Sequence, residues 1–369
     1  MAQAWERVIG ALCNHHFKPD LEAARALYSA VAAHRLDGAP VWPMVVAPPG
    51  SMKTVLLEAM DGLQDFHFID RLSPNTFLSG QLPDKKSKQT SSPSLLHRIG
   101  SSGFVVYADF STILAMHRDH RNSILADMRR IYDGKLTREF GTTDRQEERS
   151  WEGRLTFAAA CTPAIDSHFS IFQSLGERFV QIRPARPDGV QSAIRAMSQN
   201  RIAAKVELRE AVHDLFTQMR DCDPMINGED SESLASLAEF TVRARTHVPR
   251  FGQNKLIAYT PEPEAPTRLA QQLAQLIKGS AMIDGRNDVN PEDLSLARRV
   301  ALDCIPSVRR TILSSLIAGD EFSRIALPAS TRKYASDELE ALGLLASSSN
   351  SKFLSDSCVE LLAVAGMFG

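Results

Sequence analysis

The sequence predicts an α/β fold with a parallel sheet, followed by a largely helical region. Two short apolar runs, at residues 41–46 and 104–107, have the length and the bounding turns of buried strands. The first run leads through a Gly-containing loop into a helical pattern, as in a parallel sheet with crossover helices. From about residue 205 to 305 the apolar residues recur at helical spacing. Strands alternating with helices before an all-helical block indicate an α/β domain and a second, helical domain.

In chain order, the predicted elements divide the sequence into four regions. Asp20 can cap a helix in the N-terminal region. The α/β core adds a helix at 113–132, a projecting β-hairpin at 140–154, two more strands at 155–160 and 179–182, and a polar loop at 83–93. The predicted boundaries are an N-terminal helical segment at 1–40, the α/β core at 41–200, a helical lid at 201–305 and a C-terminal domain at 306–369.

The composition limits the classes of protein that fit. The formal net charge is -2, so a nucleic-acid-binding surface has to be local. The five cysteines lie singly, which fits a reducing compartment and predicts neither a disulfide framework nor a zinc site. No apolar run approaches the roughly 18 residues that cross a bilayer. We therefore expect a soluble, cytoplasmic protein without membrane contact.

The loop at residues 47–54 predicts a nucleotide site. It reads A-P-P-G-S-M-K-T, against the phosphate-binding pattern G-x-x-x-x-G-K-[ST]. Lys53 can reach the β- and γ-phosphates of ATP, and the Thr54 hydroxyl can bind Mg²⁺. Asp109 ends the second strand, where an acid adds a contact to the metal. The predicted nucleotide contacts are Pro49, Gly50, Ser51, Met52, Lys53, Thr54 and Asp109, with Thr54 and Asp109 on the metal side.

Both glycines of the pattern are replaced, which leaves an alternative interpretation open. A Pro-Gly turn ahead of an ordinary helix beginning Met-Lys-Thr would give the same sequence. Gly50 can still bend the loop, but the side chain of Met52 must then point away from a nucleotide. The strand before the loop, the helix after it and the acid at the end of the second strand favour the nucleotide site.

These motifs, in this order, resemble the AAA+ superfamily of ATPases, and within it the minichromosome-maintenance (MCM) helicase branch. That branch has Pro-Gly-x-Ala-Lys-Ser in its loop, and residues 49–54 look like a variant of it. Residues 71–80 (RLSPNTFLSG) resemble the entry to the branch's helix-2 insert. Residues 123–141 are similar to its helix and pre-sensor-1 hairpin, the element that such motors push against DNA. The resemblance covers about residues 40–305.

The resemblance implies roles for three further residues. Thr162 stands at the sensor-1 position, where the branch has Asn and where a hydroxyl can hydrogen-bond a phosphate or its water. Residues 176–179 (GERF) resemble the segment with the arginine finger, so Arg178 would act on ATP held by a neighbouring subunit. Residues 267–269 (TRL) resemble the start of the sensor-2 helix, so Arg268 would contact the γ-phosphate. The implied assembly is a ring-shaped homo-oligomer, most simply a hexamer, and the implied catalytic set is Lys53, Asp109, Thr162, Arg178 and Arg268.

One catalytic part of the family is missing. Hydrolytic AAA+ enzymes usually have a Glu directly after the strand-ending Asp, and this sequence has Phe110 there. Glu177 and Glu139 are candidates for that acid by position only. The departures at Met52, Phe110 and Thr162 therefore bear on the rate of hydrolysis.

The C-terminal region has the element order of a winged helix, with three helices and a two-stranded wing. Arg332, Lys333 and Tyr334 would then begin the recognition helix, in reach of DNA. Arg149 and Arg154 on the predicted hairpin are further DNA-binding candidates, as are the lysines of the 83–93 loop (Lys85, Lys86 and Lys88). The alternative is a small packing domain without DNA contact.

Three functions fit this sequence. The first is an oligomeric, ATP-dependent DNA motor or remodeller, helicase-like, working in replication or in the transfer of a mobile element. The second is a nucleotide-gated loader or assembly switch with little turnover, which Phe110 favours. The third is a chaperone similar to MoxR AAA+ proteins, because that group also carries a pre-sensor hairpin.

Overall fold

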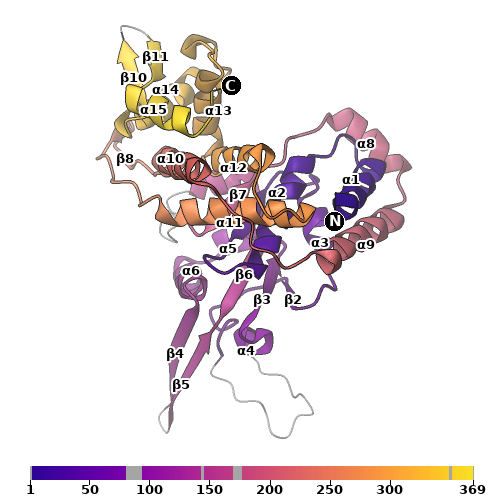
Figure 1. The fold of residues 1–369 in the computed structure, drawn as a ribbon. Coiled ribbons are helices and arrows are strands. Elements are labelled where there is room, and N and C mark those ends of the chain that lie inside the picture. The colour runs from indigo at the N-terminus through magenta and orange to yellow at the C-terminus, as the bar shows by residue number, and fades with distance from the viewer. Residues whose placement is uncertain (1, 80–93, 143–144, 169–176, 349–350, 369) are drawn as a thin grey trace, which may run out of the picture.

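A five-stranded sheet forms the centre of the molecule, in a computed structural model that describes residues 2–79, 94–142, 145–168, 177–348 and 351–368. The strand order is β2-β3-β6-β1-β7, and all pairs are parallel, which confirms the predicted fold class at that level (Figure 1). The strands are β1 (Trp42–Val46), β2 (Phe66–Ile69), β3 (Ser102–Tyr107), β6 (Arg154–Cys161) and β7 (Phe179–Ile182).

The sheet is covered on both faces, and alternate residues of its strands enter two different cores. Val45 and Val106 belong to one apolar cluster, whereas Met44 and Tyr107 belong to the other. The first cluster includes residues of α2 (Leu21–Ala32), α3 (Lys53–Glu58), α9 (Arg201–Gln218), α10 (Gly228–Arg245), α11 (Thr267–Asp284) and α12 (Pro291–Asp303). The second includes residues of α4 (Leu95–Ile99), α5 (Ser111–Leu114) and α6 (Arg118–Tyr132).

The N-terminal helices pack into the helical layer. These are α1 (Ala2–His15) and α2, and Asp20 caps α2 by accepting a 3.0 Å hydrogen bond from the Ala23 N–H, as predicted. A Cβ at Gly279 of α11 would lie 2.1 Å from the Ser29 carbonyl oxygen of α2. Only glycine therefore permits these two helices to approach so closely. A short 3-10 turn (Ala33–Arg35) leads into β1.

The projecting hairpin is longer than predicted. It consists of β4 (Lys135–Thr142) and β5 (Arg145–Glu152), so it begins at residue 135 and not at 140. The apolar Leu136 and Trp151 are buried at its base. The predicted helix at 113–132 is interrupted, and its two parts are α5 and α6. Figure 1 shows the hairpin extending from the end of the sheet that lies opposite the C-terminal helices.

The C-terminal region forms its own apolar cluster, which also includes Phe240 and Ala244 of α10. The predicted helices and the two-stranded sheet are present. The helix α15 and the small β8–β9 hairpin inside the helical region were not predicted. The elements are α13 (Ser307–Ile317), a 3-10 turn (Phe322–Arg324), α14 (Ala329–Ala341), β10 (Leu345–Ser348), β11 (Ser351–Leu354) and α15 (Asp356–Val364).

The remaining elements lie within the core, between the core and the helical region, and within the helical region. They are the 3-10 helix Pro163–His168, α8 (Gly189–Ser198), β8 (Arg250–Phe251) and β9 (Leu256–Ile257). Across the described part of the chain, none of the helices has the length and apolar character needed to cross a membrane. The predicted 83–93 loop, with its three lysines, lies outside the described residues.

Candidate functional site

Three of the predicted residues meet at the carboxyl edge of the sheet. Because β6 lies between β1 and β3, Thr162 at the end of β6 stands between Lys53 and Asp109. Lys53 Nζ donates to the Ala47 carbonyl at 3.0 Å and lies 3.5 Å from the Cys161 carbonyl oxygen. Burial raises the pKa of the Cys161 thiol, and Asp109 adds to this rise while Lys53 opposes it, so both charges lie near that thiol. The structure thus brings together residues that are more than 100 positions apart.

The loop that carries Lys53 has the bend that the sequence predicted. Gly50 has φ +78°, a conformation that favours glycine. The Ser51 N–H donates to the Pro48 carbonyl at 3.3 Å, which closes the turn. Met52 packs against the apolar cluster beneath α3, so its side chain does not occupy the ligand side of the loop. This is the orientation that Met52 needs if a nucleotide binds here.

Ser111 is a polar residue of this site that the sequence analysis missed. Its hydroxyl lies 3.1 Å from the Thr162 hydroxyl and accepts a hydrogen bond from the Thr162 N–H at 3.2 Å. Its own N–H donates to the Asp109 carboxylate at 3.1 Å. A signal was present in the sequence, because Ser111 lies two residues beyond the strand-ending acid. Asp109, Ser111 and Thr162 therefore form one connected polar edge.

Phe110 stands in the core and not in the site. Its side chain is 0 % exposed and packs edge-on against Tyr107 and Phe179. Its N–H donates to the Ala160 carbonyl at 2.7 Å. The backbone therefore directs this position inward, and an acid placed there would be buried.

Arg178 lies at the opposite edge of the sheet. It precedes β7, whereas Lys53 and Thr162 follow their strands, and all five strands run parallel. The four residues of β7 span roughly 13 Å. Arg178 is 7 % exposed, and its Nη2 lies 3.2 Å from both carboxylate oxygens of Asp133. Its guanidinium also stacks 5.4 Å from the centre of the Tyr132 ring.

Arg268 lies beside Arg178 and not beside Lys53. It opens α11, and Gln272, one turn later, donates to the Arg178 carbonyl at 2.7 Å. Burial lowers the pKa of Arg178; Asp133 opposes this shift, and the nearby charge of Arg268 adds to it. The expectation that Arg268 contacts a γ-phosphate can therefore apply only to a nucleotide on another subunit.

Glu177 and Glu139 lie away from the carboxyl edge of their own chain. Glu177 is buried and lies 2.5 Å from Arg245, which also hydrogen-bonds Glu264. Burial raises the pKa of Glu177 to about 7. Glu139 lies on β4 of the projecting hairpin. Both residues are therefore at a distance from Lys53, and Glu177 belongs to an ion-pair network at the amino edge.

The two arginines predicted for DNA contact on the hairpin have partners within the chain. Arg149 is buried on β5, and its Nη1 donates to the Ser79 carbonyl at 2.7 Å. Arg154 is the first residue of β6, so its predicted position on the hairpin is wrong. It donates to the carbonyl groups of Gly38 and Ala33. Neither side chain extends from the hairpin toward solvent.

The predicted recognition-helix residues are also engaged, apart from Lys333, which is exposed. Arg332 Nη1 donates to the carbonyls of Ser323 and Ile325 at 2.9 and 3.0 Å. The Tyr334 ring lies 5.0 Å from the Arg250 guanidinium. Contacts within the protein thus occupy this end of α14.

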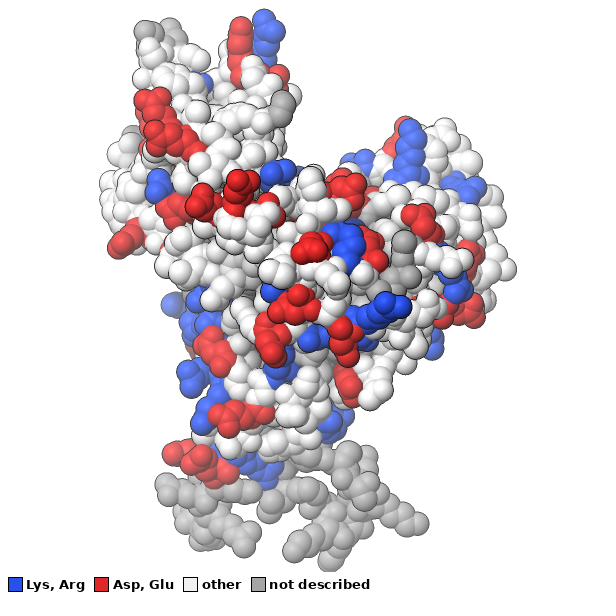
Figure 2. Space-filling view, viewed as in Figure 1, with Lys and Arg blue, Asp and Glu red and all other residues white. Residues whose placement is uncertain are grey.

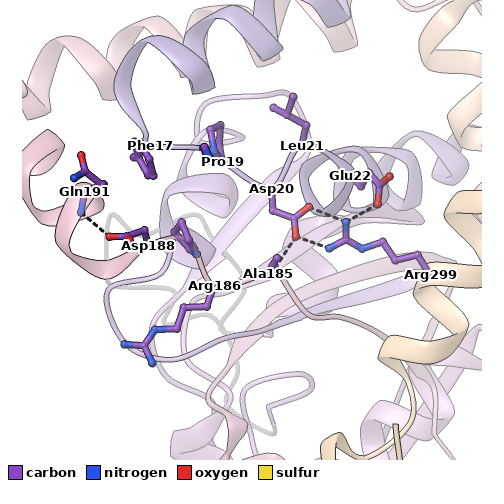
Figure 3. A pocket seen from close by; sticks show the side chains of 12 residues that line it. Phe17, Pro19, Asp20, Leu21, Glu22, Ala185, Arg186, Asp188, Gln191 and Arg299 are labelled. Carbon is purple, nitrogen blue, oxygen red and sulfur yellow. Dashed lines mark hydrogen bonds and ion pairs between the residues drawn. The ribbon is translucent and has the colours of Figure 1, made fainter. Parts of the chain in front are cut away.

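A groove of about 640 Å³ opens at the carboxyl edge, beside the end of β7 (Figure 3). Asp20 closes its inner side by accepting hydrogen bonds from the Ala185 N–H at 2.6 Å and from Arg299 at 2.7 Å. Burial acts to raise the pKa of Asp20, but these hydrogen bonds lower it overall. Because Ile182, at the end of β7, pairs with Val45 near the end of β1, the groove lies at the same edge of the sheet as the Lys53 loop, although its lining does not include that loop.

Among the described residues, the site offers few side chains that could bind a metal ion. Within the described residues, no three His, Cys, Asp or Glu side chains are grouped to hold a metal ion. Thr54 and Asp109 offer oxygen ligands for part of a Mg²⁺ shell, which is normally completed by phosphate oxygens and water. In comparisons with known proteins, no family matches the chain and no curated protein is significantly similar to it.

Proposed function

We propose that the chain binds Mg²⁺–ATP and works as an AAA+-type ATPase with active sites completed between subunits. The observation that carries this proposal is the division of the polar groups between two sheet edges. Lys53, Asp109 and Thr162 meet at the carboxyl edge, while Arg178 and Arg268 lie together at the amino edge. Phosphoryl transfer needs cations around the transferred group. A neighbouring copy can supply them, which requires an oligomer such as a ring.

When ATP binds, its phosphate oxygens replace the backbone carbonyls as hydrogen-bond partners of Lys53. The Lys53 ammonium turns from the Ala47 and Cys161 carbonyls to phosphate oxygens, where its hydrogen bonds are charge-assisted. The hydroxyls of Ser111 and Thr162, 3.1 Å apart, can orient a γ-phosphate or the attacking water. Without an acid at position 110, we expect slow hydrolysis.

The same contacts suggest how binding of ATP could change the position of the projecting hairpin. Asp133, the partner of Arg178, is separated from the first residue of β4 only by Gly134. When Arg178 turns to the phosphate of a neighbour, Asp133 loses that partner at the base of the hairpin. We propose that the resulting hairpin movement acts on DNA, in a helicase-like motor or remodeller. A winged-helix-like C-terminal domain would contribute to DNA binding only after the β8–β9 hairpin leaves Tyr334.

A nucleotide titration tests the first step. We expect a fluorescent ATP analogue to bind in the presence of Mg²⁺, and Lys53→Ala to weaken binding by about 100-fold or more, because a charge-assisted hydrogen bond is lost. Lys205→Ala is the matched control, since Lys205 is an exposed lysine that pairs with Glu58 of the same helix α3. Equal binding by wild type and Lys53→Ala would refute the proposal.

Phosphate release with and without single-stranded DNA tests the second step. A DNA-stimulated rate, and DNA affinity that falls with rising salt, are expected for the motor. Binding of DNA without any salt dependence, or no binding at low salt, would instead favour a protein substrate, as for a MoxR-like chaperone.

The second candidate function is a nucleotide-gated loader or assembly switch. The observation that favours it is the burial of Phe110, which leaves no acid in the position next to Asp109. For this function, ATP would still bind through Lys53, but phosphate release would remain at the level of Lys53→Ala with DNA present.

A further inference from the structure

Helix α8 exposes an apolar surface that no other part of the described chain buries. None of its residues is buried, and its apolar side chains recur at helical spacing on one face. Val190 is 68 % exposed and Met197 80 %, with Ile194 between them. Ile202, at the start of α9, is 77 % exposed. Exposed apolar groups gathered in this way mark interaction sites in soluble proteins.

A second apolar surface lies on the β8–β9 hairpin. Phe251 and Leu256 face each other across the two strands, and both are more than half exposed, as is Tyr259 just after β9. The hairpin is held firmly in place by Arg250. This side chain donates to Glu338 at 2.7 Å and to the Tyr334 carbonyl at 2.6 Å, both on α14. A fixed hairpin presents its apolar side chains with little loss of conformational freedom on binding.

The two surfaces lie on opposite flanks of the molecule. In Figure 1, α8 is at the upper right and β8 at the left. Asp188, the N-cap of α8, and Gln191 of α8 line the groove at the carboxyl edge, and Lys205 of the next helix, α9, pairs with Glu58 of α3, which begins at Lys53. The β8–β9 hairpin follows Arg245, the partner of Glu177, and thus shares a flank with Arg178. The α8 surface therefore lies on the flank of Lys53, and the β8–β9 surface lies on the flank of Arg178.

We infer that the α8 surface of one copy docks on the β8–β9 surface of the next copy, head to tail. Two different patches on opposite flanks produce a heterologous contact, which leads to a ring or a helical array and not to a closed two-fold dimer. This inference rests on the proposed function for its orientation, because the same contact brings Arg178 toward the neighbour's Lys53 edge.

The charges around the two surfaces are complementary. Arg186 and Arg201 flank α8, and Glu262 follows Tyr259; all three are exposed and have no ion pair with another described residue. In Figure 2 the surface over α8 is mainly white with scattered basic groups. A second copy of this chain offers the exposed apolar side chains of β8–β9 and, beside them, the carboxylate of Glu262, while Lys255 of the hairpin lies over the Tyr334 ring.

Cross-linking between two variants that each carry one added surface cysteine tests the contact directly, with the unsubstituted background as the control for the partly buried Cys222. The background is Cys13→Ser, because Cys13 is an exposed thiol. We expect a short bismaleimide to link Met197→Cys to Leu256→Cys when the two variants are mixed, and neither variant to link to itself. A chain that carries both substitutions should form a ladder beyond dimers. Self-linking of Met197→Cys, or no link in the mixture, would overturn the head-to-tail contact.

A surface substitution tests its energetic importance. We expect Ile194→Asp to weaken self-association by about tenfold or more in sedimentation experiments, since a charge replaces a central apolar contact. Phe353→Asp, an exposed apolar position on β11 outside both surfaces, should leave association unchanged. A wild-type association constant for Ile194→Asp, or a wild-type chain that stays monomeric, would refute the inference.

Nucleotide binding separates the failure of this inference from failure of the proposed function. If Ile194→Asp abolishes assembly while the monomer still binds the ATP analogue, both stand. Assembly through these surfaces without ATP binding refutes the proposed function alone. ATP binding without cross-links refutes the docking contact alone.

Discussion

The two edges of the central sheet differ in how their charged groups are satisfied. At the carboxyl edge, Lys53 contacts only backbone carbonyls, and Asp109 is exposed to solvent. At the amino edge, Arg178 is paired with Asp133, and Arg245 with Glu177 and Glu264. The first edge can receive an anion by exchanging weak partners. The second has to give up ion pairs before its arginines can act on anything else.

Under the proposed function, this difference explains why one chain would bind the nucleotide but would need a neighbouring copy to complete the active site. Buried, paired charges are costly to separate, because a single charge left in the interior is poorly solvated. A neighbouring triphosphate can offset that cost by offering a stronger acceptor to Arg178. The amino edge is thus suited to respond to a partner, and the carboxyl edge to bind a ligand without one.

The largest expected effect is on the free energy of unfolding, for a substitution of Phe110 beside the carboxyl edge. We expect Phe110→Glu to lower the free energy of unfolding by about 4 kcal/mol, because it places a carboxylate in an apolar core. Phe110→Leu should cost only about 1 kcal/mol, since it stays apolar. Denaturant unfolding measures both. A Phe110→Glu variant as stable as wild type would mean that solvent reaches position 110 at the carboxyl edge.

Mixed assemblies test the separation of the two edges. Lys53→Ala and Arg178→Ala should each be inactive in phosphate release, while a mixture regains activity on the order of 100-fold, because one subunit supplies Lys53 and the next supplies Arg178. Arg178→Ala alone should keep the ATP affinity of the monomer within about threefold. A loss of ATP affinity in the isolated Arg178→Ala chain would mean that Lys53 and Arg178 act in one site of the same chain. The two sheet edges would then not have separate roles.

The pH dependence of stability sharpens the description of the amino edge. Burial raises the pKa of Glu177 from 4.5 to about 7, so the folded state holds its proton more tightly than the unfolded state. Its contribution is therefore fully present below pH 4.5 and is lost as the pH rises toward 7, by about 1 kcal/mol per pH unit at most. Unfolding of wild type and Glu177→Gln across this range should show that decline only in wild type.

His34 offers a test with the opposite sign at the same edge. Burial lowers the pKa of His34 to about 4, and the neutral ring hydrogen-bonds Thr156 and Ser102 at 2.8 and 2.9 Å. Its contribution is present above pH 6.5 and is lost as the pH falls toward 4, by about 1 kcal/mol per pH unit, the same slope as for Glu177. His34→Asn should remove that loss in acid unfolding experiments. A variant with an unchanged acid profile would contradict the assignment.

The smallest effect is expected on the projecting hairpin. Glu139→Gln should change phosphate release by less than about twofold, since Glu139 lies on β4 and extends from the amino edge, away from Lys53. A loss of turnover with normal ATP binding would restore Glu139 as the catalytic acid, acting from another subunit.

Local patterns in the sequence were sufficient for the carboxyl edge. The apolar runs before Ala47 and before Asp109 are strands, and strands joined by helices form a parallel sheet whose carboxyl ends share one edge. Lys53 and Asp109 follow directly from that rule, whereas Thr162 was assigned from the resemblance to the AAA+ superfamily. Ser111 could have been added by the same reasoning.

The amino edge could not be predicted in this way, because the partner of a charge is chosen by the fold. Arg154 looked like an exposed hairpin residue, yet it binds the Gly38 carbonyl, 116 positions away. Tyr334 looked like a base-reading residue, yet Arg250 and Lys255 lie on its ring. Residue type and spacing say that a side chain is charged or aromatic, but not what it meets.

The sequence by itself therefore determined four of the five strands of the sheet, but not β2, and it determined that Lys53, Asp109 and Thr162 follow strand ends at one edge. Only the tertiary structure decided that Phe110 faces the core, that Arg178 and Arg268 lie together, and that their edge is held by ion pairs. The physical reason is the distance along the sequence between the residues that interact. Strand and loop signals depend on a few consecutive residues, whereas burial and ion pairing depend on segments that meet only after the chain has folded.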